Sequence, residues 1–184
     1  MKKGLMIVLW LFIAATGWSQ TAVKWYTIDE ALKLNKTKPK KLLVDIYTDW
    51  CGWCKKMDKD TYADTAIARY INDNFYAVKF NAEQRGPVMY NGKQYNFVSQ
   101  GARGYHEFAA AMFNGQSMGY PATGFFGQDS NFLILISGYQ GPLDMEALLH
   151  YFTEEIYKTG VGIQTYSAKY QKQKKSQNYQ GPPM

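Results

Sequence analysis

Cysteine is scarce in this 184-residue chain: only Cys51 and Cys54 occur, three positions apart in the stretch DWCGWCKKM. Two thiols are too few for a disulfide framework of the kind that holds small secreted domains together. A chain of this length can build a single domain with its own hydrophobic core, and a bridge across so short a loop removes little entropy from the unfolded chain. A purely structural staple is therefore a poor explanation for the pair.

Histidine is equally scarce, and this excludes two further uses of the cysteines. A zinc site made of two cysteines and two histidines needs closely spaced histidines, whereas His106 and His150 are 44 positions apart. Covalent haem attachment needs C-x-x-C-H, and position 55 is lysine. We therefore expect no metal site, and a redox-active pair is the interpretation that remains.

Positive charge is in excess, but the excess is absent from the central part of the chain. The formal net charge is +6, and six lysines near the two ends account for it: Lys2, Lys3 and four within residues 169–175. Residues 20–158 hold all 15 acidic residues and 15 basic ones, which cancel. Nucleic-acid binding requires a basic patch on the folded domain, so we expect no nucleic-acid partner.

No apolar run is long enough to cross a membrane. The longest, residues 4–16, would form about 20 Å of helix, against the ~30 Å of a bilayer core. It follows two lysines and precedes small residues, which is the layout of a secretory signal peptide over residues 1–19. We expect a periplasmic or otherwise exported protein in an oxidising compartment, with an uncleaved N-terminal membrane anchor as the alternative.

Internal repeats are also absent, and strand-like and helix-like segments alternate along residues 20–158, which predicts one α/β domain. Residues 41–48 form a near-continuous apolar run, typical of a central buried strand. Thr27 or Asp29, and further along Asp64, are candidate N-caps of helices. The predicted order is β-α-β-α-β, an insert and β-β-α, in which the second α consists of two helical stretches, 52–60 and 64–75. The other segments are 22–26, 28–36, 41–48, 75–82, 84–118, 122–127, 131–139 and 142–158.

The two cysteines follow the strand at 41–48 directly and open a helix, which gives them different reactivity. A thiol at a helix N-terminus faces unpaired backbone N–H groups and the positive end of the helix dipole, and both favour the thiolate. The thiolate is the attacking species in disulfide exchange, so Cys51 is predicted to be the nucleophile. Cys54, one turn into the helix, is placed to resolve the mixed disulfide.

The segment LLVDIYTDWCGWCK resembles the active site of the thioredoxin-like proteins of bacterial envelopes that carry a W-C-G-W-C-K core. The resemblance covers about residues 23–158. It implies a thioredoxin fold, with a central mixed β-sheet flanked by helices and the insert at about 84–118 placed before a cis-proline. It also implies thiol–disulfide oxidoreductase activity on protein disulfides.

The resemblance assigns roles to residues outside the cysteine pair. Asp45, six residues before Cys51, matches the family's buried acid, which manages the proton of the resolving thiol, and Lys79 matches the lysine beside that acid. Pro121 matches the cis-proline opposite the cysteines, which exposes the backbone of Tyr120 to an incoming extended peptide. Three plainer interpretations stay open: a strand-end carboxylate at 45, a snorkelling lysine at 79 and an ordinary trans-proline at 121.

The chain departs from the family pattern within the active site. Gly52-Trp53 replaces the common Gly-Pro between the cysteines, and the following helix lacks the usual proline, so Thr61 and its neighbours are expected to end it. Trp50 and Trp53 flank cysteines that must be accessible. We therefore expect both indoles to form a surface wall beside the thiols and, with Gly52, to contact substrate; the alternative is that both lie in the core.

Two segments lie outside the simplest thioredoxin pattern. In the insert, Asn91-Gly92 between aromatic, alternating flanks predicts a two-residue hairpin, and residues 105–113 predict a short amphipathic helix. Because the insert re-enters the domain at Pro121, substrate selection is one interpretation of its role and structural elaboration is the other. Residues 159–184 are polar and rich in Gln and Lys, so we expect a mobile basic tail, with docking of Tyr166 and Tyr170 as a helical turn as the alternative for its first part.

These features together predict an exported thiol–disulfide oxidoreductase, more a reductase or isomerase than a primary oxidant, because a buried acid suits attack by Cys54 on the mixed disulfide. Its expected partners are protein thiols and disulfides as substrates and an electron donor in the membrane or envelope, and it is expected to be a monomer. No cofactor is expected beyond the redox-active disulfide Cys51–Cys54. The alternative is a non-catalytic thioredoxin-fold peptide-binding module or holdase, in which the thiols are inert.

Overall fold

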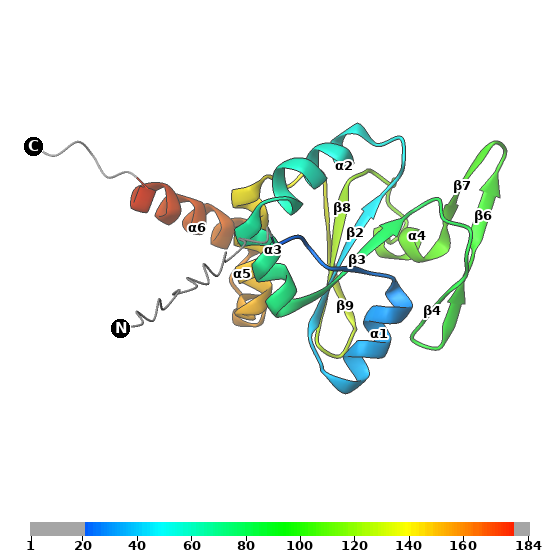
Figure 1. Cartoon of the computed structure of the whole chain (residues 1–184), viewed down its shortest axis with the longest axis horizontal. Coiled ribbons are helices and arrows are strands. Elements are labelled where there is room, and N and C mark those ends of the chain that lie inside the picture. The colour runs from blue at the N-terminus through cyan, green and yellow to red at the C-terminus, as the bar shows by residue number, and fades with distance from the viewer. Residues whose placement is uncertain (1–20, 179–184) are drawn as a thin grey trace, which may run out of the picture.

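A five-stranded mixed β-sheet forms the centre of the molecule (Figure 1). The structure is a computed structural model that describes residues 21–178. Across the sheet the strands run in the order β1-β3-β2-β8-β9; β1, β3 and β2 are parallel, and β8 pairs antiparallel with both β2 and β9. The strands are β1 (Trp25–Tyr26), β2 (Lys41–Tyr47), β3 (Phe75–Asn81), β8 (Ala122–Phe126) and β9 (Phe132–Ser137).

β2 occupies the middle of the sheet because its side chains are buried on both faces. Six of its seven residues are buried, as the near-continuous apolar run predicts. β2 pairs in parallel with β3, from Lys41 opposite Phe75 to Tyr47 opposite Asn81, and antiparallel with β8. The C-terminal end of β2 therefore has a strand on each side where it leads into the loop that carries the cysteines.

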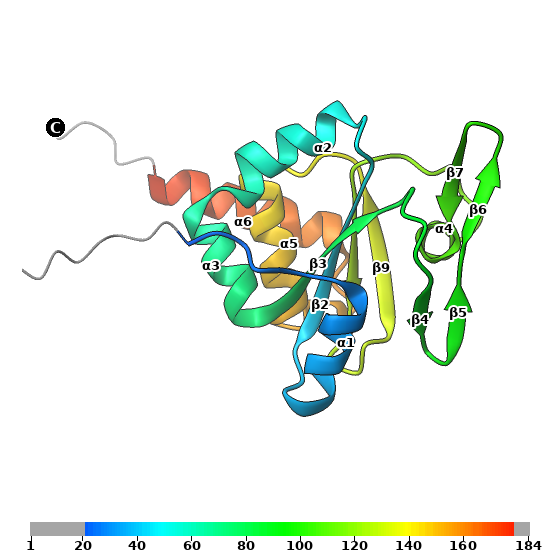
Figure 2. The same cartoon turned by 45° about the vertical axis from the view of Figure 1, so that its right-hand side comes forward.

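Helices cover both faces of the sheet (Figure 2). Alternate residues of β2 belong to the two hydrophobic cores on these faces. Val44 and Ile46 pack with α1, α4 and part of the insert, whereas Leu43 packs with α2, α3 and α5. Two hydrophobic cores result, one on each face. The helical segments are α1 (Ile28–Thr37), α2 (Gly52–Met57), a π-helical turn (Asp58–Tyr62), α3 (Thr65–Asn74), α4 (Glu107–Phe113), α5 (Pro142–Thr153), a 3-10 turn (Ile156–Thr159) and α6 (Ile163–Asn178).

Helices α1 and α3 begin at caps that the sequence predicts. Thr27 caps α1: its hydroxyl accepts from the N–H of Glu30 at 3.2 Å, and the Glu30 carboxylate accepts from the N–H of Thr27 at 2.8 Å. Asp64 caps α3 by accepting from the N–H groups of Ala66 and Ile67. Each cap pairs N–H groups that the first helical turn leaves without partners, so both helix starts are confirmed.

The first hairpin of the insert is confirmed. β4 (Val88–Tyr90) and β5 (Lys93–Tyr95) pair antiparallel and meet at Asn91-Gly92. Both turn residues have positive φ, which the two-residue turn requires and which Asn and Gly tolerate best. The inner side of this hairpin joins the core on the α1 face, where Val88 is buried.

A second hairpin follows that the sequence analysis does not predict. β6 (Phe97–Gln100) and β7 (Arg103–His106) pair antiparallel, and their polar tip carries no alternating apolar pattern that would mark them as strands. Because β7 takes up the start of the segment expected to be helical, α4 begins only at Glu107. Figure 2 shows α4 lying between the sheet and these hairpins.

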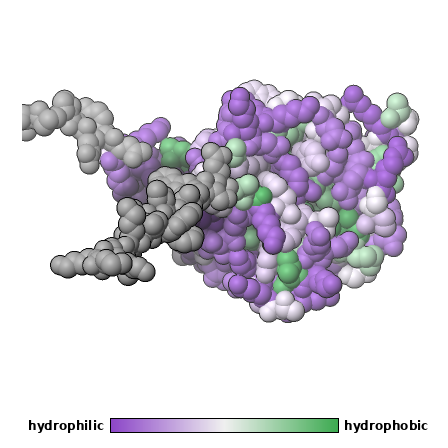
Figure 3. Space-filling view, viewed as in Figure 1, coloured by the Kyte–Doolittle hydropathy of each residue, from purple (hydrophilic) through white to green (hydrophobic). Residues whose placement is uncertain are grey.

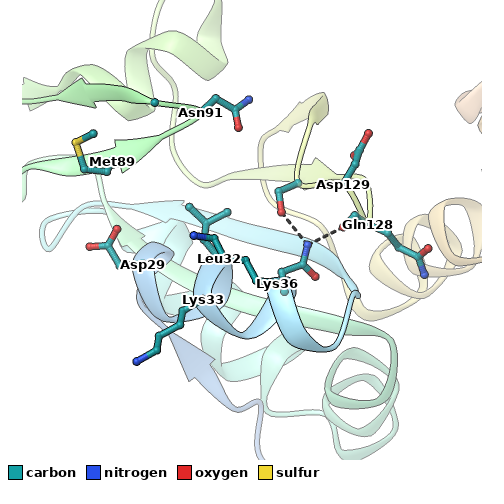
Figure 4. Close-up of a pocket in the computed structure, with 11 residues that line it drawn as sticks. Asp29, Leu32, Lys33, Lys36, Met89, Asn91, Gln128 and Asp129 are labelled. Carbon is teal, nitrogen blue, oxygen red and sulfur yellow. Dashed lines mark hydrogen bonds between the residues drawn. The ribbon is translucent and has the colours of Figure 1, made fainter.

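Asn35 ties α1 to the turn between β8 and β9, at the end of β2 away from the cysteines. Its amide nitrogen donates to the Gln128 carbonyl at 2.6 Å and to the Ser130 hydroxyl at 2.8 Å, while its Oδ1 accepts from the Lys40 N–H at 2.7 Å. A pocket of about 600 Å³ lies between α1, this turn and the β4–β5 turn (Figure 4). Because its hydrogen-bonding capacity is used within the fold, Asn35 acts as a structural link.

The prediction of a mobile basic tail is corrected, since residues 163–178 form the helix α6, which packs against α5. The Tyr166 ring lies 5.4 Å from the Tyr151 ring, and the Tyr170 ring lies 5.2 Å from the His150 ring, measured between centroids. Two tyrosines one turn apart supply the apolar contact that a segment poor in aliphatic residues otherwise lacks. The folded domain therefore includes this helix.

Two predictions fall outside the described residues. These are the signal peptide over residues 1–19, with its membrane-anchor alternative, and the end of the basic tail at 179–184. Within residues 21–178 no helix is both long enough and apolar enough to cross a membrane. The face shown in Figure 3 is mostly hydrophilic, with hydrophobic side chains gathered only in small patches.

Candidate active site

Cys51 and Cys54 lie at the C-terminal end of β2, where the chain turns into α2, and their sulfurs form a disulfide. Cys51 is the N-cap residue of α2, and its Cα lies 5.3 Å from that of Cys54. The backbone N–H of Cys54 donates to Sγ of Cys51 at 3.1 Å. An N–H directed at this sulfur stabilises negative charge on it, and the helix dipole acts in the same direction.

The active-site helix continues beyond α2 as the π-helical turn Asp58–Tyr62, without a proline. The buried Thr61 hydroxyl donates to the Gln140 carbonyl at 2.7 Å, and the helical segment ends at Tyr62, next to the predicted end. Both ends of the turn reach Lys79 on β3: Asp58 forms an ion pair with it, and the Tyr62 ring centroid lies 5.4 Å from its Nζ. Such turns inside helices often occur at functional sites.

Asp45 is the buried acid of this site, with only 2% of its side chain exposed. It lies in β2 opposite Lys79 of β3; its Oδ2 accepts a hydrogen bond from Lys79 Nζ at 2.5 Å, while Oδ1 has no hydrogen-bond partner. Burial raises the pKa of Asp45 to about 6, against the opposing effect of the Lys79 charge. A carboxyl group that titrates near neutrality can both hold and release a proton, as the role implied by the resemblance requires.

Lys79 is held by carboxylates and by aromatic rings. Its Nζ forms ion pairs with Asp45 and Asp58 and lies 5.0 Å from the ring centroids of both Trp25 and Tyr47. Burial disfavours the ammonium form, but the two carboxylates outweigh burial and raise the pKa of Lys79. Its charged end is therefore bound inside the site, and the snorkelling alternative is wrong.

Trp50 and Trp53 form the predicted surface wall. They are 53% and 60% exposed, whereas Cys51 and Cys54 are 5% and 3% exposed. Gly52, between the cysteines, is exposed as well. The alternative that both tryptophans lie in the core is wrong, and the largest exposed rings of the described chain flank the covered sulfurs.

The Tyr120–Pro121 peptide bond is cis, as predicted, and lies just before β8. The Tyr120 ring meets the Trp50 ring edge-to-face at a centroid distance of 6.0 Å, so this segment and the segment before Cys51 come together in space. Pro121 is buried, and its carbonyl accepts from the Gly138 N–H at 2.8 Å. The trans alternative is wrong, while substrate contact by Tyr120 and Pro121 stays a prediction.

The structure adds to the site three charged residues that the sequence does not predict. Asp58 supplies the second carboxylate described above. The carboxylate of Glu83 accepts from the indole N–H of Trp50 at 3.1 Å, and the Arg103 guanidinium of β7 lies 5.2 Å from the centroid of a Trp50 ring. The spacing of four residues from Cys54 to Asp58 was a usable signal, because it places both on one helix face. No local pattern connects Glu83 or Arg103 with Trp50.

The chemistry available here is that of the cysteine pair and of the buried carboxyl group of Asp45. A disulfide and a dithiol differ by two electrons and two protons; the sulfurs carry the electrons, and Asp45 offers a place for a proton. Within the part of the chain that the structure describes, no three His, Cys, Asp or Glu side chains are grouped so that they could hold a metal ion.

Comparison with known families decides where this chain belongs. Residues 16–133 match the family model Thioredox_DsbH, which is described as "Protein of unknown function, DUF255". The chain belongs to the Thioredox_DsbH family. The matched range contains both Cys51–Cys54 and Tyr120-Pro121, and the name of the family model marks it as thioredoxin-like, as the resemblance implied.

Curated relatives of this Thioredox_DsbH protein are much longer than it is. The chain is 26% identical over 144 residues to "Uncharacterized protein B0495.5" of Caenorhabditis elegans. The aligned region covers 77% of this chain and 18% of that protein. It is 31% identical over 68 residues to "Thiol:disulfide interchange protein DsbD" of Citrobacter koseri. This aligned region covers 35% of this chain and 12% of that protein. The chain thus spans less than a fifth of the length of these relatives.

Solved structures with low sequence identity share the fold of this Thioredox_DsbH protein. A thioredoxin-fold protein from Helicobacter pylori has a TM-score of 0.56 at 17% identity, with 76% of this chain and 88% of that chain covered. A thioredoxin from Thermus thermophilus has a TM-score of 0.52 at 15% identity, with 76% and 91% covered. A structure described as "DsbH Oxidoreductase" has a TM-score of 0.50 at 15% identity, with 83% and 95% covered. The predicted thioredoxin fold is confirmed.

Proposed function

We propose that this Thioredox_DsbH protein is a thiol–disulfide oxidoreductase that acts on disulfides of exported proteins, as a reductase or isomerase. The observation that carries the proposal is the Cys51–Cys54 disulfide at the start of α2, directly after the strand that holds the buried Asp45. The same chemistry, thiol:disulfide interchange, is named for the relative DsbD. The predicted signal peptide supports an exported location.

The reductive direction begins with the reduced protein and with Cys51 as a thiolate. Its Sγ attacks one sulfur of the substrate disulfide and forms a new S–S bond with that sulfur. The substrate S–S bond breaks, and the other substrate sulfur leaves as a thiolate that takes a proton from water. Before this attack, the N–H groups at the start of α2 stabilise the negative charge on Cys51.

Cys54 completes the reaction. Its thiol gives its proton to the Asp45 carboxylate, and its Sγ attacks Sγ of Cys51, so that the bond between Cys51 and the substrate breaks and the second substrate thiolate leaves. The products are a reduced substrate and the Cys51–Cys54 disulfide, and two electrons have passed to the substrate. A dithiol electron donor in the membrane or envelope returns the pair to its reduced form by the reverse exchange.

Substrate binding is assigned to the rim around the cysteine pair. Trp50, Gly52 and Trp53 are exposed there, and Tyr120 joins the rim through its ring contact with Trp50. We assign to Tyr120 and Pro121 the backbone contacts with an extended substrate segment, as the resemblance implies. Exposed aromatic side chains suit the apolar side chains of an unfolded or extended substrate.

Trapping of mixed disulfides tests this function. Cys54→Ser should accumulate adducts with substrate proteins that dithiothreitol releases, whereas its matched variant Cys51→Ser should accumulate almost none, because it lacks the attacking sulfur. Both variants should lose reduction of insulin disulfides. If Cys51→Ser retained every activity of the wild type, the protein would instead be a non-catalytic peptide-binding module or holdase.

A further inference from the structure

Arg103 lies against the residue that precedes the attacking cysteine. Its guanidinium is 5.2 Å from a Trp50 ring centroid, and Trp50 is joined directly to Cys51. The Trp50 ring in turn meets the Tyr120 ring, which comes just before Pro121. The guanidinium therefore borders the surface between the two segments to which substrate binding is assigned.

The guanidinium of Arg103 has no carboxylate partner within residues 21–178. No carboxylate of this range forms an ion pair with it, whereas the Glu83 carboxylate on the same indole is engaged by the Trp50 N–H at 3.1 Å. Arg103 is exposed, so its charge and its planar set of N–H donors are accessible to solvent beside Trp50. A guanidinium stacked on an aromatic ring keeps its donor edge available for a carboxylate, which it binds through two parallel hydrogen bonds.

The hairpin that carries Arg103 is attached firmly to the domain. β6 and β7 are paired along their whole length. The Phe97 ring of β6 lies across Gly104 of β7, where a Cβ atom would come within 2.3 Å of the ring. At the end of β7, the fully buried His106 donates its backbone N–H to the Ala82 carbonyl at 2.7 Å. Arg103 is therefore presented by a paired strand whose far end is anchored in the core.

We infer that Arg103 determines substrate specificity: it binds the carboxylate of an Asp or Glu side chain next to the substrate cysteine that Cys51 attacks. This inference rests on the proposed oxidoreductase function and adds a substrate class to it, disulfides flanked by acidic residues. The attraction is electrostatic and surface-exposed, so it acts on the encounter with substrate and weakens as salt concentration rises.

Arg85 offers a matched control on the same insert. Its guanidinium is exposed and lies 4.8 Å from the Phe97 ring, as that of Arg103 lies near Trp50. In the described range it also forms no ion pair. The two arginines thus share charge, exposure and aromatic stacking, and they differ in which ring they stack on.

The test uses two synthetic disulfide-bonded peptides that differ only in having Glu or Lys beside the attacked cysteine. The full-length reduced protein reduces each peptide, the reaction is quenched with acid, and the products are separated by chromatography to give a rate. Each rate is divided by the rate of the same peptide with dithiothreitol, which corrects for differences in intrinsic reactivity between the peptides. At low salt we expect the wild type to reduce the Glu peptide about fivefold faster than the Lys peptide, with a ratio near one at ~1 M salt. Arg103→Gln should bring the ratio to about one and Arg103→Glu should invert it, whereas Arg85→Gln should preserve it.

The outcomes separate the inference from the function on which it rests. Equal corrected rates for the two peptides in the wild type, or a Glu preference that survives Arg103→Glu, would overturn the role of Arg103 and leave the oxidoreductase function standing. No reaction with either peptide would overturn both. Arg103→Gln, which keeps a similar side chain at this exposed position, serves as the decisive variant if Arg103→Glu lowers the melting temperature.

Discussion

Asp45 and Lys79 lie opposite each other on the parallel strands β2 and β3, with Oδ2 of the acid 2.5 Å from Nζ of the lysine. The same ammonium also pairs with Asp58 of the active-site helix, whose side chain is 45% exposed. One lysine thus connects a buried carboxyl group with a carboxylate at the surface. The ionisation of Asp45, and with it the step assigned to Cys54, depends on this arrangement.

Asp45→Asn should slow the resolution of mixed disulfides. In the wild type, the rate of attack by Cys54 should rise with pH through about 6, the pKa of Asp45, because only the carboxylate accepts the proton. Asparagine cannot accept it, so the variant should lose this inflection and react roughly 100-fold more slowly at neutral pH. Rapid-quench kinetics on a preformed mixed disulfide measure the step. A profile identical to that of the wild type would remove Asp45 from the mechanism.

The same substitution should stabilise the fold at neutral pH. Burial raises the pKa of Asp45 from 3.8 to about 6, so between these values the folded protein binds more protons than the unfolded chain and stability falls as pH rises. Asp45→Asn avoids the buried charge. It should therefore raise the free energy of unfolding by about 3 kcal/mol at pH 7, and the gain should disappear below about pH 4. Urea unfolding across this pH range is the measurement, and a variant less stable than the wild type at pH 7 would contradict it.

Lys79→Met and Asp58→Asn should move the pKa of Asp45 in opposite directions. Lys79 opposes the effect of burial, so its removal should shift the kinetic inflection of Asp45 above pH 6. Asp58 raises the pKa of Asp45 by its negative charge and shares the ammonium of Lys79, so Asp58→Asn should shift the inflection below pH 6. Carboxyl carbon NMR reports the same pKa directly. Shifts of the same sign in both variants would disprove the link through Lys79.

His106 should make the insert sensitive to acid. The side chain is fully buried; its Nδ1 accepts from the Phe108 N–H at 3.1 Å, and its Nε2 lies 2.9 Å from the Gly86 carbonyl oxygen. Burial lowers the pKa of His106, so below its ordinary value of 6.5 the unfolded chain binds the proton first and stability falls as pH drops. His106→Asn keeps a side-chain acceptor at this N-cap and cannot be protonated. When the pH is lowered from 7 to about 5, the unfolding free energy of the wild type should therefore fall more than that of this variant. A constant difference would contradict the prediction.

Several site residues could be predicted because they share one continuous segment. Cys51 and Cys54 directly follow the strand pattern of β2, which was enough to place them at the start of α2, and the family resemblance added Asp45 on the same strand. Pro121 could be placed because it directly precedes the β8–β9 hairpin. In each case the position along the chain determines the position in space.

Contacts between distant segments could not be predicted in this way. Arg103 reaches Trp50 only because a polar hairpin folds back toward the start of α2, and hydrophobic periodicity does not mark polar strands. The full length of helix α6 was missed for a related reason, since its composition is mostly polar. Its contacts come from Tyr166 and Tyr170, and they depend on a matching aromatic surface on α5.

The central claim is that Cys51 is the attacking thiol, and brief alkylation of the reduced protein with iodoacetamide near neutral pH tests it most directly. In the disulfide form the two cysteines are 5% and 3% exposed, and the expected difference in the reduced protein rests on thiolate character, which the Cys54 N–H favours at Cys51. We predict that mass spectrometry finds the label on Cys51 first, with a rate that follows a pKa below the ordinary value of about 8.5, while Cys54 stays unmodified. Label on Cys54 first, or equal label on both, would contradict the claim.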